Sequence, residues 1–452
     1  MAKKMLFLFV LLLSLTGMLK AQVTTAGMSG KVMADEESVI GATVVAVHEP
    51  SGTSYGTVTN VDGRFSLQGM RSGGPYKVTV SYIGYQTAIY TDIQLQLGET
   101  YSLNVTLHEA SELLGEITIT ASKSKFSAEK TGATTNISSE QLTTLPSINR
   151  SISDFTRISP YASGNSFGGR DGRSNTFTVD GANLNNNFGL SSGLPGGGNP
   201  ISLDAIDEVQ VVIAPYDVRQ ANFIGAGINA ITKSGTNAYR GSAYMYFNNE
   251  VMRGNKIGDT DFGARAEESK TVYGATFGGP IIKDKLFFFA NVEYEKSPQQ
   301  VITWRAAKEG EDPNNSTISR TTEADLAEFS QILKDKYGYN TGSFTDFPAD
   351  VTNLKLLGRI DWNINQGNKL SVRYNFTNNK TWEAPNGSSG NTGYRLAYNR
   401  VSAYSMSYAN SCYSLQNIVN SATAELNSRF SSNISNQLLF TYSDMKDERG
   451  TN

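Results

Sequence analysis

Long segments with strict apolar–polar alternation fill the chain from Ala238 onward, and they constrain the fold more than any other feature. In one such segment Val292 and Tyr294 fall on one face, whereas Asn291 and Glu293 fall on the other. Because successive side chains of a strand point to opposite faces, this period of two predicts β-strands. Charges on the polar face and aromatic residues on the apolar face are typical of a transmembrane barrel with a wet lumen.

The same alternation recurs in residues 370–377, 422–430 and 437–443. Strands of about ten residues are typical of membrane barrels, whereas strands of soluble proteins average about five or six. A soluble sandwich is the alternative, and the length of these segments favours the barrel over it. We therefore expect residues 238–452 to form part of a transmembrane antiparallel β-barrel.

One polar insertion, at residues 306–350, interrupts the alternation. Thr322 is followed three residues later by Asp325, which is a helix-start signature, and we predict a helix over 322–339. Four apolar residues would share one face of that helix: Leu326, Phe329, Ile332 and Leu333. The long loops of barrels lie on the extracellular side, so this insertion is a candidate ligand-contacting loop.

The N-terminal 21 residues indicate a secretory signal peptide. Lys3 and Lys4 precede an apolar run at positions 5–13, which is short of the ~20 apolar residues that a spanning helix needs. A membrane-anchoring helix is the alternative. We expect the mature chain to begin near Gln22.

Residues 28–107 contain short alternating segments separated by turn signals such as Asp62-Gly63, which predicts a small β-sandwich. The predicted strands are 30–33, 42–48, 56–60, 64–68, 76–82, 86–90 and 101–107. A polar linker follows at 110–130 and holds one strand-competent peptide: Glu116, Ile117, Thr118, Ile119, Thr120 and Ala121. An exposed extended peptide can add to the sheet edge of a partner, although an ordinary linker strand is the alternative.

Residues 131–237 are rich in glycine and asparagine and cannot form a continuous core of their own. Such a segment can form close-fitting loops inside a larger structure, because missing Cβ atoms let backbone approach backbone. Composition also excludes several functions. The 39 basic and 42 acidic side chains nearly cancel, which excludes a basic nucleic-acid binder. His48, His108 and Cys412 are the only imidazoles and thiol, so we predict no metal, no cofactor and no catalytic residue.

Two resemblances extend this interpretation. The segments Ile40-Gly-Ala-Thr-Val and Thr59-Asn-Val-Asp-Gly-Arg-Phe-Ser-Leu resemble the carboxypeptidase-regulatory-like domain, a carbohydrate-binding-like sandwich without peptidase activity. The segments Gly169-Arg-Asp-Gly-Arg-Ser-Asn-Thr-Phe-Thr-Val-Asp-Gly181 and Ile228-Asn-Ala-Ile-Thr-Lys strongly resemble the plug of TonB-dependent outer-membrane receptors. The run Tyr216-Asp-Val-Arg219 is similar to that of the Oar-like subgroup from Bacteroidetes and relatives.

The resemblance implies two sets of site residues. The plug motifs supply Arg150, Arg170, Gly172, Asn175, Asp180, Gly181, Asp207 and Glu208. The junction between plug and barrel supplies Asp217, Arg219, Gly227, Asn229, Lys233 and Gly235. Residues 116–121 would then be the TonB box, the peptide with which TonB pairs.

What the resemblance implies is a mainly β protein with a periplasmic sandwich, a mixed α/β plug and the first strands of an outer-membrane barrel. Its partners would be TonB with its energising inner-membrane complex, outer-membrane lipid and an unknown extracellular ligand (glycan, peptide or chelate), with no nucleic acid. Two alternatives remain open: an Oar-like barrel taking part in protein export, and a surface adhesin. The run Ala121-Ser-Lys-Ser-Lys125 departs from the glycan-importing branch, so a lipoprotein lid partner is not implied.

The length of the barrel segment predicts an incomplete barrel. From Ala238 the chain has 452 − 237 = 215 residues, which at roughly 25 residues per strand and connection gives about eight or nine strands. A barrel closed with about eight strands has no room for a plug of ~100 residues. We therefore expect an N-terminal fragment of a receptor whose curved sheet partly surrounds the plug, and we expect residues 444–452 to form a charged loop.

Overall fold

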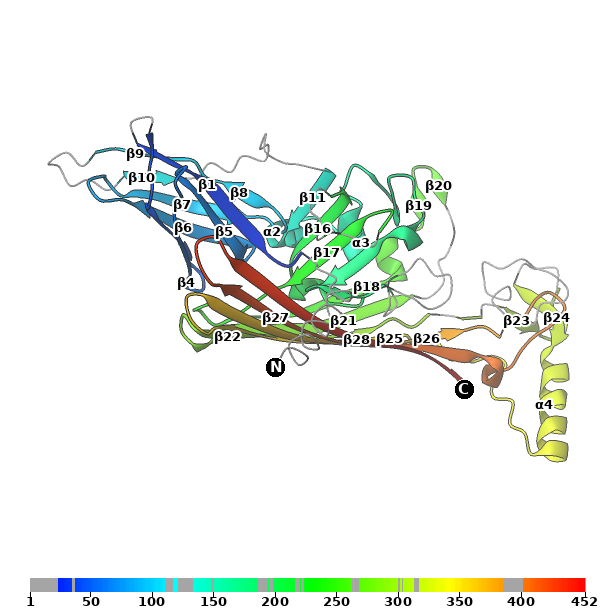
Figure 1. Ribbon diagram of the computed structural model, residues 1–452. Helices are drawn as coiled ribbons and strands as arrows, with labels where there is room; N and C mark the ends of the chain where they lie inside the picture. The colour runs from blue at the N-terminus through cyan, green and yellow to red at the C-terminus, as the bar shows by residue number, and fades with distance from the viewer. Residues whose placement is uncertain are drawn as a thin grey trace, which may run out of the picture.

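Three bodies follow one another along the chain, each built on its own β-structure (Figure 1). The structure is a computed structural model. It describes residues 23–34, 37–109, 117–120, 133–147, 150–185, 194, 198–215, 220, 223–261, 263, 268–299, 301–302, 304–312, 317–385 and 401–451. The predicted fold class is confirmed: a sandwich comes first, a plug second, and a long antiparallel sheet third.

The sandwich has two sheets around one apolar core. The first sheet holds β1 (Ala26–Ala34), β2 (Glu37–Ser38), β5 (Arg64–Met70), β8 (Thr100–Ser102) and β9 (Val105–Leu107). The second has the order β10 (Ile117–Thr120), β7 (Ala88–Leu95), β6 (Gly73–Ser81), β3 (Thr43–His48) and β4 (Thr53–Val58). Alternate residues of both sheets, among them Met28, Val44 and Val78, are fully buried between them, as the period-two pattern requires.

The plug is a mixed sheet with short helices beside it. The sheet order is β11 (Ala133–Ser138), β16 (Ile206–Ala214), β17 (Gly227–Thr232), β14 (Thr176–Val179) and β15 (Ala182–Asn183). Helices α2 (Ser139–Thr144) and α3 (Ile152–Thr156) each begin with a capping box, formed by Ser138 with Gln141 and by Ser151 with Asp154. The remaining short elements are β12 (Ala162–Ser163), β13 (Ser166–Phe167), η1 (Gly172–Ser174) and η2 (Leu203–Ala205).

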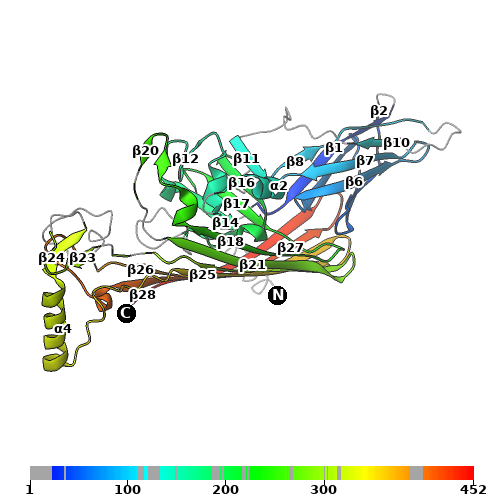
Figure 2. The ribbon, with the colours of Figure 1, turned by 180° about the vertical axis from the view of Figure 1, so that it is seen from behind.

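The third body, which we call the wall, is a curved seven-stranded meander that passes beneath both the plug and the sandwich (Figures 1 and 2). Its strands are β18 (Arg240–Asn249), β21 (Ser269–Ile282), β22 (Leu286–Lys296), β25 (Thr352–Asn363), β26 (Asn368–Glu383), β27 (Tyr413–Arg429) and β28 (Ser435–Thr451). Each strand pairs with the next along the chain, and within the described residues β18 and β28 are the two edges.

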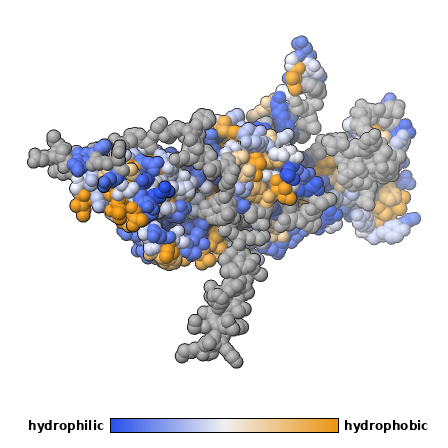
Figure 3. Space-filling view, turned by 45° about the horizontal axis from the view of Figure 1, so that its top comes forward, coloured by the Kyte–Doolittle hydropathy of each residue, from blue (hydrophilic) through white to orange (hydrophobic). Residues whose placement is uncertain are grey.

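Burial in the wall is inverted relative to a soluble sheet. The face toward the plug is polar and buried, with Glu293 at 4% and Arg373 at 6% exposure. The opposite face is apolar and exposed, with Val372 at 44% and Phe440 at 65%. This arrangement is that of a barrel wall with lipid outside, and it excludes the soluble sandwich that we kept as an alternative. Figure 3 shows exposed hydrophobic patches on a mainly hydrophilic surface.

Long and short connections of the wall lie at opposite ends. Residues 283–285, 364–367 and 430–434 form short turns, whereas the longer segments 250–268, 297–351 and 384–412 separate the remaining strands in sequence, and we call these the long loops. The long loops carry η3 (Glu250–Arg253), β19 (Lys256–Ile257), β20 (Thr260–Asp261), β23 (Arg305–Ala307), β24 (Ile318–Thr322), α4 (Glu323–Tyr337) and η5 (Ala409–Ser411). No helix in the described part of the chain is long and apolar enough to cross a membrane.

The predicted helix is confirmed as α4, with the Thr322–Asp325 capping box at its start and Gly338 in the left-handed region at its end. Of its apolar face only Leu326 is buried, whereas Phe329 is 52% exposed. The expected charged loop at 444–452 is wrong, because β28 continues to Thr451 in register with β27. Cross-strand contacts explain the difference: the Arg449 guanidinium lies 4.5 Å from the centroid of the Tyr413 ring.

Candidate functional site

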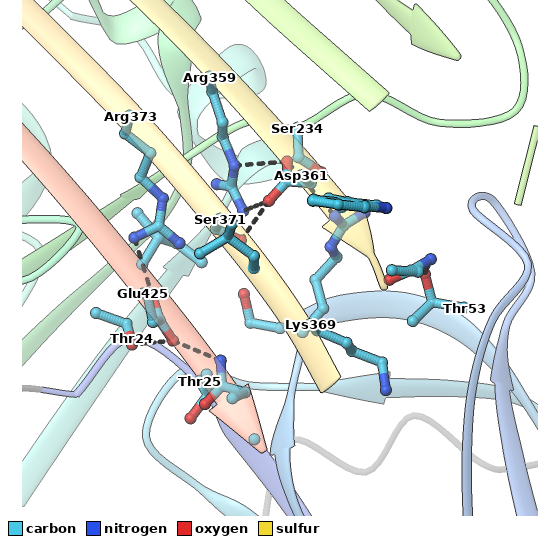
Figure 4. A pocket seen from close by; sticks show the side chains of 18 of the residues that line it. Thr24, Thr25, Thr53, Ser234, Arg359, Asp361, Lys369, Ser371, Arg373 and Glu425 are labelled. Carbon is cyan, nitrogen blue, oxygen red and sulfur yellow. Dashed lines mark hydrogen bonds and ion pairs between the residues drawn. The ribbon is translucent and has the colours of Figure 1, made fainter. Parts of the chain in front are cut away.

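The sandwich, the plug and the wall meet near the short turns, around a cavity of ≈ 60 Å³. Thr24, Thr25 and Thr53 line it from the N-terminal part of the chain, and Ser234 from the end of the plug (Figure 4). Arginine, lysine and carboxylate side chains from β25, β26 and β27 line it from the wall. The site is therefore a three-body junction.

The wall contributes two ion pairs that are almost completely buried. Arg359 binds Asp361 on the same strand in a bidentate arrangement, with N–O distances of 2.8 and 2.9 Å. Arg373 on β26 binds Glu425 on β27 at 3.1 Å. Period two places all four side chains on the inward face. Arg359 lies two residues from Asp361 and pairs with Arg373 across strands, and Glu425 pairs with the residue two positions before Arg373.

The plug contributes Asp180, which follows β14 in a tight turn with Gly181. Both residues have positive φ, 49° and 80°, a conformation that glycine adopts without cost and aspartate tolerates. The Asp180 carboxylate accepts hydrogen bonds from the Thr232 amide at 3.0 Å and the Thr232 hydroxyl at 2.7 Å. It lies farther from the wall, 3.6 Å from Arg373 and 4.0 Å from Arg359.

The N-terminal part of the chain completes this junction. Arg71 of the sandwich lies 3.6 Å from Asp361, and the Thr24 hydroxyl donates to Glu425 at 2.9 Å. Asp180, Asp361 and Glu425 thus face Arg71, Arg359 and Arg373, so the charges of the cluster balance. We call these six residues the charge cluster.

A second contact ties the sandwich directly to the plug. The Leu97 amide donates to both oxygens of Glu208 at 3.0 and 3.1 Å, and the Gln210 side chain donates to the Leu97 carbonyl. Leu97 itself is buried against Val23 and Ile231. Burial raises the pKa of Glu208 to about 8, and the neighbouring Asp207 carboxylate adds to the rise while the Leu97 amide opposes it.

Arg150 forms a separate contact between plug and wall. Its guanidinium lies 3.7 Å from the centroid of the Tyr246 ring on β18 and pairs with Asp204 within the plug. Glu293 of the wall is 4.0 Å away and pairs with Lys355 at 2.8 Å. Arg150 therefore lies apart from the charge cluster, although the same family motifs predicted Arg150 and Asp180.

The other predicted plug residues have structural roles within the plug. Asn175 accepts from the Ala226 amide at 2.9 Å, and Asn229 accepts from the Thr178 hydroxyl at 2.8 Å. A Cβ at Gly172 would lie 2.9 Å from the Asn165 carbonyl oxygen, which explains the glycine. Arg170 is exposed, and only its backbone contacts are seen here, so the structure does not bring it to the site.

The predicted junction residues in the described part of the chain lie within β17 or directly after it. A Cβ at Gly235 would lie 2.5 Å from the Phe288 carbonyl oxygen, so the chain leaves the plug in close contact with the wall. Within the plug, a Cβ at Gly227 would lie 2.7 Å from the Phe223 ring, and the Lys233 amide donates to the Ala205 carbonyl at 2.8 Å. Asp217 and Arg219 lie outside the described residues, as do Glu116 and Ala121 of the predicted TonB box.

Sequence reasoning missed the residues that surround Asp180 at the three-body junction. Arg359, Arg373 and Glu425 carried a detectable signal, since each is a charge on the inward face of an alternating segment. Arg71 and Thr24 carried none, because nothing local to them indicates docking on the wall.

A larger polar cavity of ≈ 220 Å³ opens near the long loops, at the opposite end of the plug. Asn199 lines it from the plug, and Asn353 and Asn379 from the wall. Its cations are paired: Arg253 binds Glu268 at 2.7 Å and Lys270 binds Glu295 at 2.7 Å. In the described part of the chain no cluster of His, Cys, Asp and Glu is placed to hold a metal ion.

Comparisons with known proteins agree with this architecture. Residues 27–108 match the carboxypeptidase regulatory-like domain, and residues 231–452 match an outer membrane beta barrel domain. The TonB-dependent transporter Oar of Myxococcus xanthus is 25% identical over 343 residues, which are 72% of this chain and 30% of that protein. This chain thus spans less than a third of that relative.

Solved structures give a weaker likeness. The siderophore receptor PirA from Pseudomonas aeruginosa is 14% identical with a TM-score of 0.43, covering 71% of this chain and 42% of that one. The outer membrane transporter YddB from Escherichia coli is 13% identical with a TM-score of 0.44, covering 70% and 39%.

An inverted wall with a plug on its polar face defines an outer-membrane β-barrel protein with an occluded lumen. The regulatory-like domain, the barrel domain and the similarity to Oar narrow this class further. Together they support a TonB-dependent receptor with an N-terminal carboxypeptidase regulatory-like domain.

Proposed function

We propose that this chain works in TonB-dependent transport, in which a pull from the periplasm moves the plug relative to the wall and opens a passage. Barrels have short periplasmic turns and long extracellular loops, so the charge cluster lies at the periplasmic end and the ≈ 220 Å³ cavity at the extracellular end. The sandwich then lies in the periplasm. The partners are TonB with its inner-membrane complex, outer-membrane lipid and an extracellular ligand.

The observation that carries this proposal is the way charges are divided at the plug–wall contact. Asp180 makes its two short hydrogen bonds within the plug, to Thr232. Arg359 and Arg373 each have a carboxylate partner within the wall, Asp361 and Glu425. The contacts that cross between the bodies are the 3.6 and 4.0 Å ion pairs to Asp180 and two hydrogen bonds to plug backbone, from Arg359 to the Thr232 carbonyl and from Arg373 to the Asp180 carbonyl. Separation therefore leaves each charge with a partner, which lowers the cost of moving the plug.

Other functions have less support. The similarity to the transporter Oar favours transport over the surface adhesin and over an enzyme, and we propose that the chain has no catalytic activity. The direction of transport and the ligand class (glycan, peptide or chelate) stay predictions. Paired cations around the ≈ 220 Å³ cavity give that site no excess positive charge for an anionic ligand.

The test targets the predicted TonB box. Replacing Ile117 and Ile119 by proline removes two backbone amides that a strand-adding partner requires, so binding of the periplasmic domain of TonB should be lost. Pull-down with that domain measures binding, and heat-modifiable gel mobility checks insertion into the outer membrane. The control is Ser127→Pro in the same linker. Undiminished TonB binding by the double variant would show that these residues are only a linker.

A further inference from the structure

The predicted TonB box is paired with the sandwich in this structure. Residues Ile117–Thr120 form β10, which runs parallel to β7 in the register Ile117↔Ala88 to Thr120↔Thr91 (Figure 1). β10 is the outermost strand of the five-stranded sheet β10-β7-β6-β3-β4. The extended peptide is therefore added to a sheet edge of its own chain.

The accepting edge on β7 matches the peptide in length. On its other side β7 pairs with β6 through Ala88, Ile89 and Tyr90, so β10 occupies the side that would otherwise be open. Pairing with β10 stops at Thr91, and the next residue, Asp92, has a φ of 60°. This left-handed residue ends the regular extended backbone that a parallel partner follows. The four residues of β7 that accept the peptide, 88–91, thus match the four residues of β10.

We propose that the edge of β7 is a strand-binding site for the chain's own Ile117–Thr120, and that its occupation withholds this peptide from TonB. The proposal rests on the proposed function, because it assigns regulation to the same peptide. A strand-adding partner recognises backbone amides and carbonyls, and β7 holds those of one edge of the peptide. The two strands therefore compete for the same groups.

The short segment between the sandwich and β10 favours pairing of β10 with β7 without making that pairing permanent. Only seven residues, 110–116, separate the end of the sandwich at Glu109 from Ile117. A tether of this length gives an effective concentration in about the millimolar range. Parallel pairing over four residues is weak by itself, so an energised or locally concentrated partner can displace β7.

A disulfide between register partners tests the proposal. Thr118→Cys and Ile89→Cys, in a Cys412→Ala background, place two thiols on paired residues of β10 and β7. The probe is the purified periplasmic domain of TonB, bound to the full protein in detergent. We expect binding at least tenfold weaker in the oxidised protein than in the same protein after reduction.

A matched control separates this effect from a general effect of cross-linking. Val45→Cys and Thr79→Cys join β3 to β6 in the same sheet without touching β10, and oxidation should leave binding unchanged. Equal binding by the oxidised and reduced Thr118/Ile89 pair would overturn the proposal, since TonB would then use the other edge of β10.

Hydrogen exchange of the unmodified protein distinguishes this failure from failure of the proposed function. Protection of the alternate amides in 117–120 that point toward β7 is expected if β7 holds the peptide, and fast exchange of all four amides overturns the strand-binding site. If those amides are protected but even the reduced protein binds no TonB domain, the assignment of the TonB box fails and the masking role fails with it.

Discussion

At the residue scale, Asp180 is the junction residue whose backbone and side chain are both restricted by the structure. Its backbone holds a left-handed turn, and its carboxylate is 2% exposed between Thr232 and two arginines. The sequence motif predicted that Asp180 and Gly181 matter but not what they contact. Arg359 and Arg373 come 179 and 193 positions later, and a one-residue slip in strand register would turn both outward.

Removing Asp180 should loosen the plug. In Asp180→Ala the Thr232 bonds are lost and two buried guanidiniums lose a neighbouring charge, which we expect to cost about 3–5 kcal/mol. Thermal unfolding of the protein measures the stability, and entry of a large antibiotic into cells measures leakage past the plug. The control is Asp171→Ala, which breaks the exposed pair with Arg173 and should change neither measurement.

At the scale of elements, sequence reasoning worked where a signal is local. The capping box fixed the start of α4, and alternation fixed the strands and faces of the wall. It failed where tertiary pairing decides. The predicted strand 56–60 lies at Thr53–Val58, because it pairs with β3 in a hairpin, and β28 runs on through charged residues because β27 pairs with it.

The contact of β7 and its following turn with β16 should depend on pH. The pKa of Glu208 is raised to about 8 at the interface, above its ordinary value of 4.5, so the docked state retains a proton that the separated state releases. Docking should therefore weaken as pH rises from about 4.5 through 8. Glu208→Gln keeps an acceptor for the Leu97 amide and should remove this dependence.

Hydrogen exchange at residues 95–98, measured from pH 5 to 9, follows this docking. We expect exchange to accelerate with pH beyond its intrinsic rise in the unmodified protein and to follow only the intrinsic rise in the glutamine variant. Identical profiles in the two proteins would mean that Glu208 is not the source of the pH dependence of docking.

At the scale of the whole molecule, the sandwich has a core of its own and should fold alone. Burial lowers the pKa of His48 to about 3, and the Arg71 guanidinium adds to this shift. The unfolded chain therefore binds a proton that the folded domain excludes, so stability should be full above about pH 6.5 and fall as pH falls toward 3.

Urea unfolding of residues 23–121 at pH 7 and pH 4 measures this loss. His48→Asn should reduce the difference between the two pH values. Non-cooperative unfolding at pH 7 would contradict an independent domain.

Docking of the three bodies was beyond prediction from the sequence, because each body satisfies its own pattern and the contacts between them join residues hundreds of positions apart. The Asn363 side chain, for example, donates to Thr53 at 3.0 Å across 310 positions. The alternation did predict the inverted wall, since the polar face of each strand is typical of a barrel lumen and the apolar face is typical of a lipid-facing surface.

That inversion leads to the last prediction. Val372 is 44% exposed on the outward face of β26, between Ile360 and Ala424 of its neighbours. Arginine there must enter the hydrocarbon, so Val372→Arg should lower stability in lipid vesicles by about 2–4 kcal/mol. The control is Val61→Arg on the sandwich, where valine is 74% exposed to water. Urea titration in vesicles measures both variants. If Val372→Arg is tolerated as well as Val61→Arg, the outward face of the wall does not contact lipid.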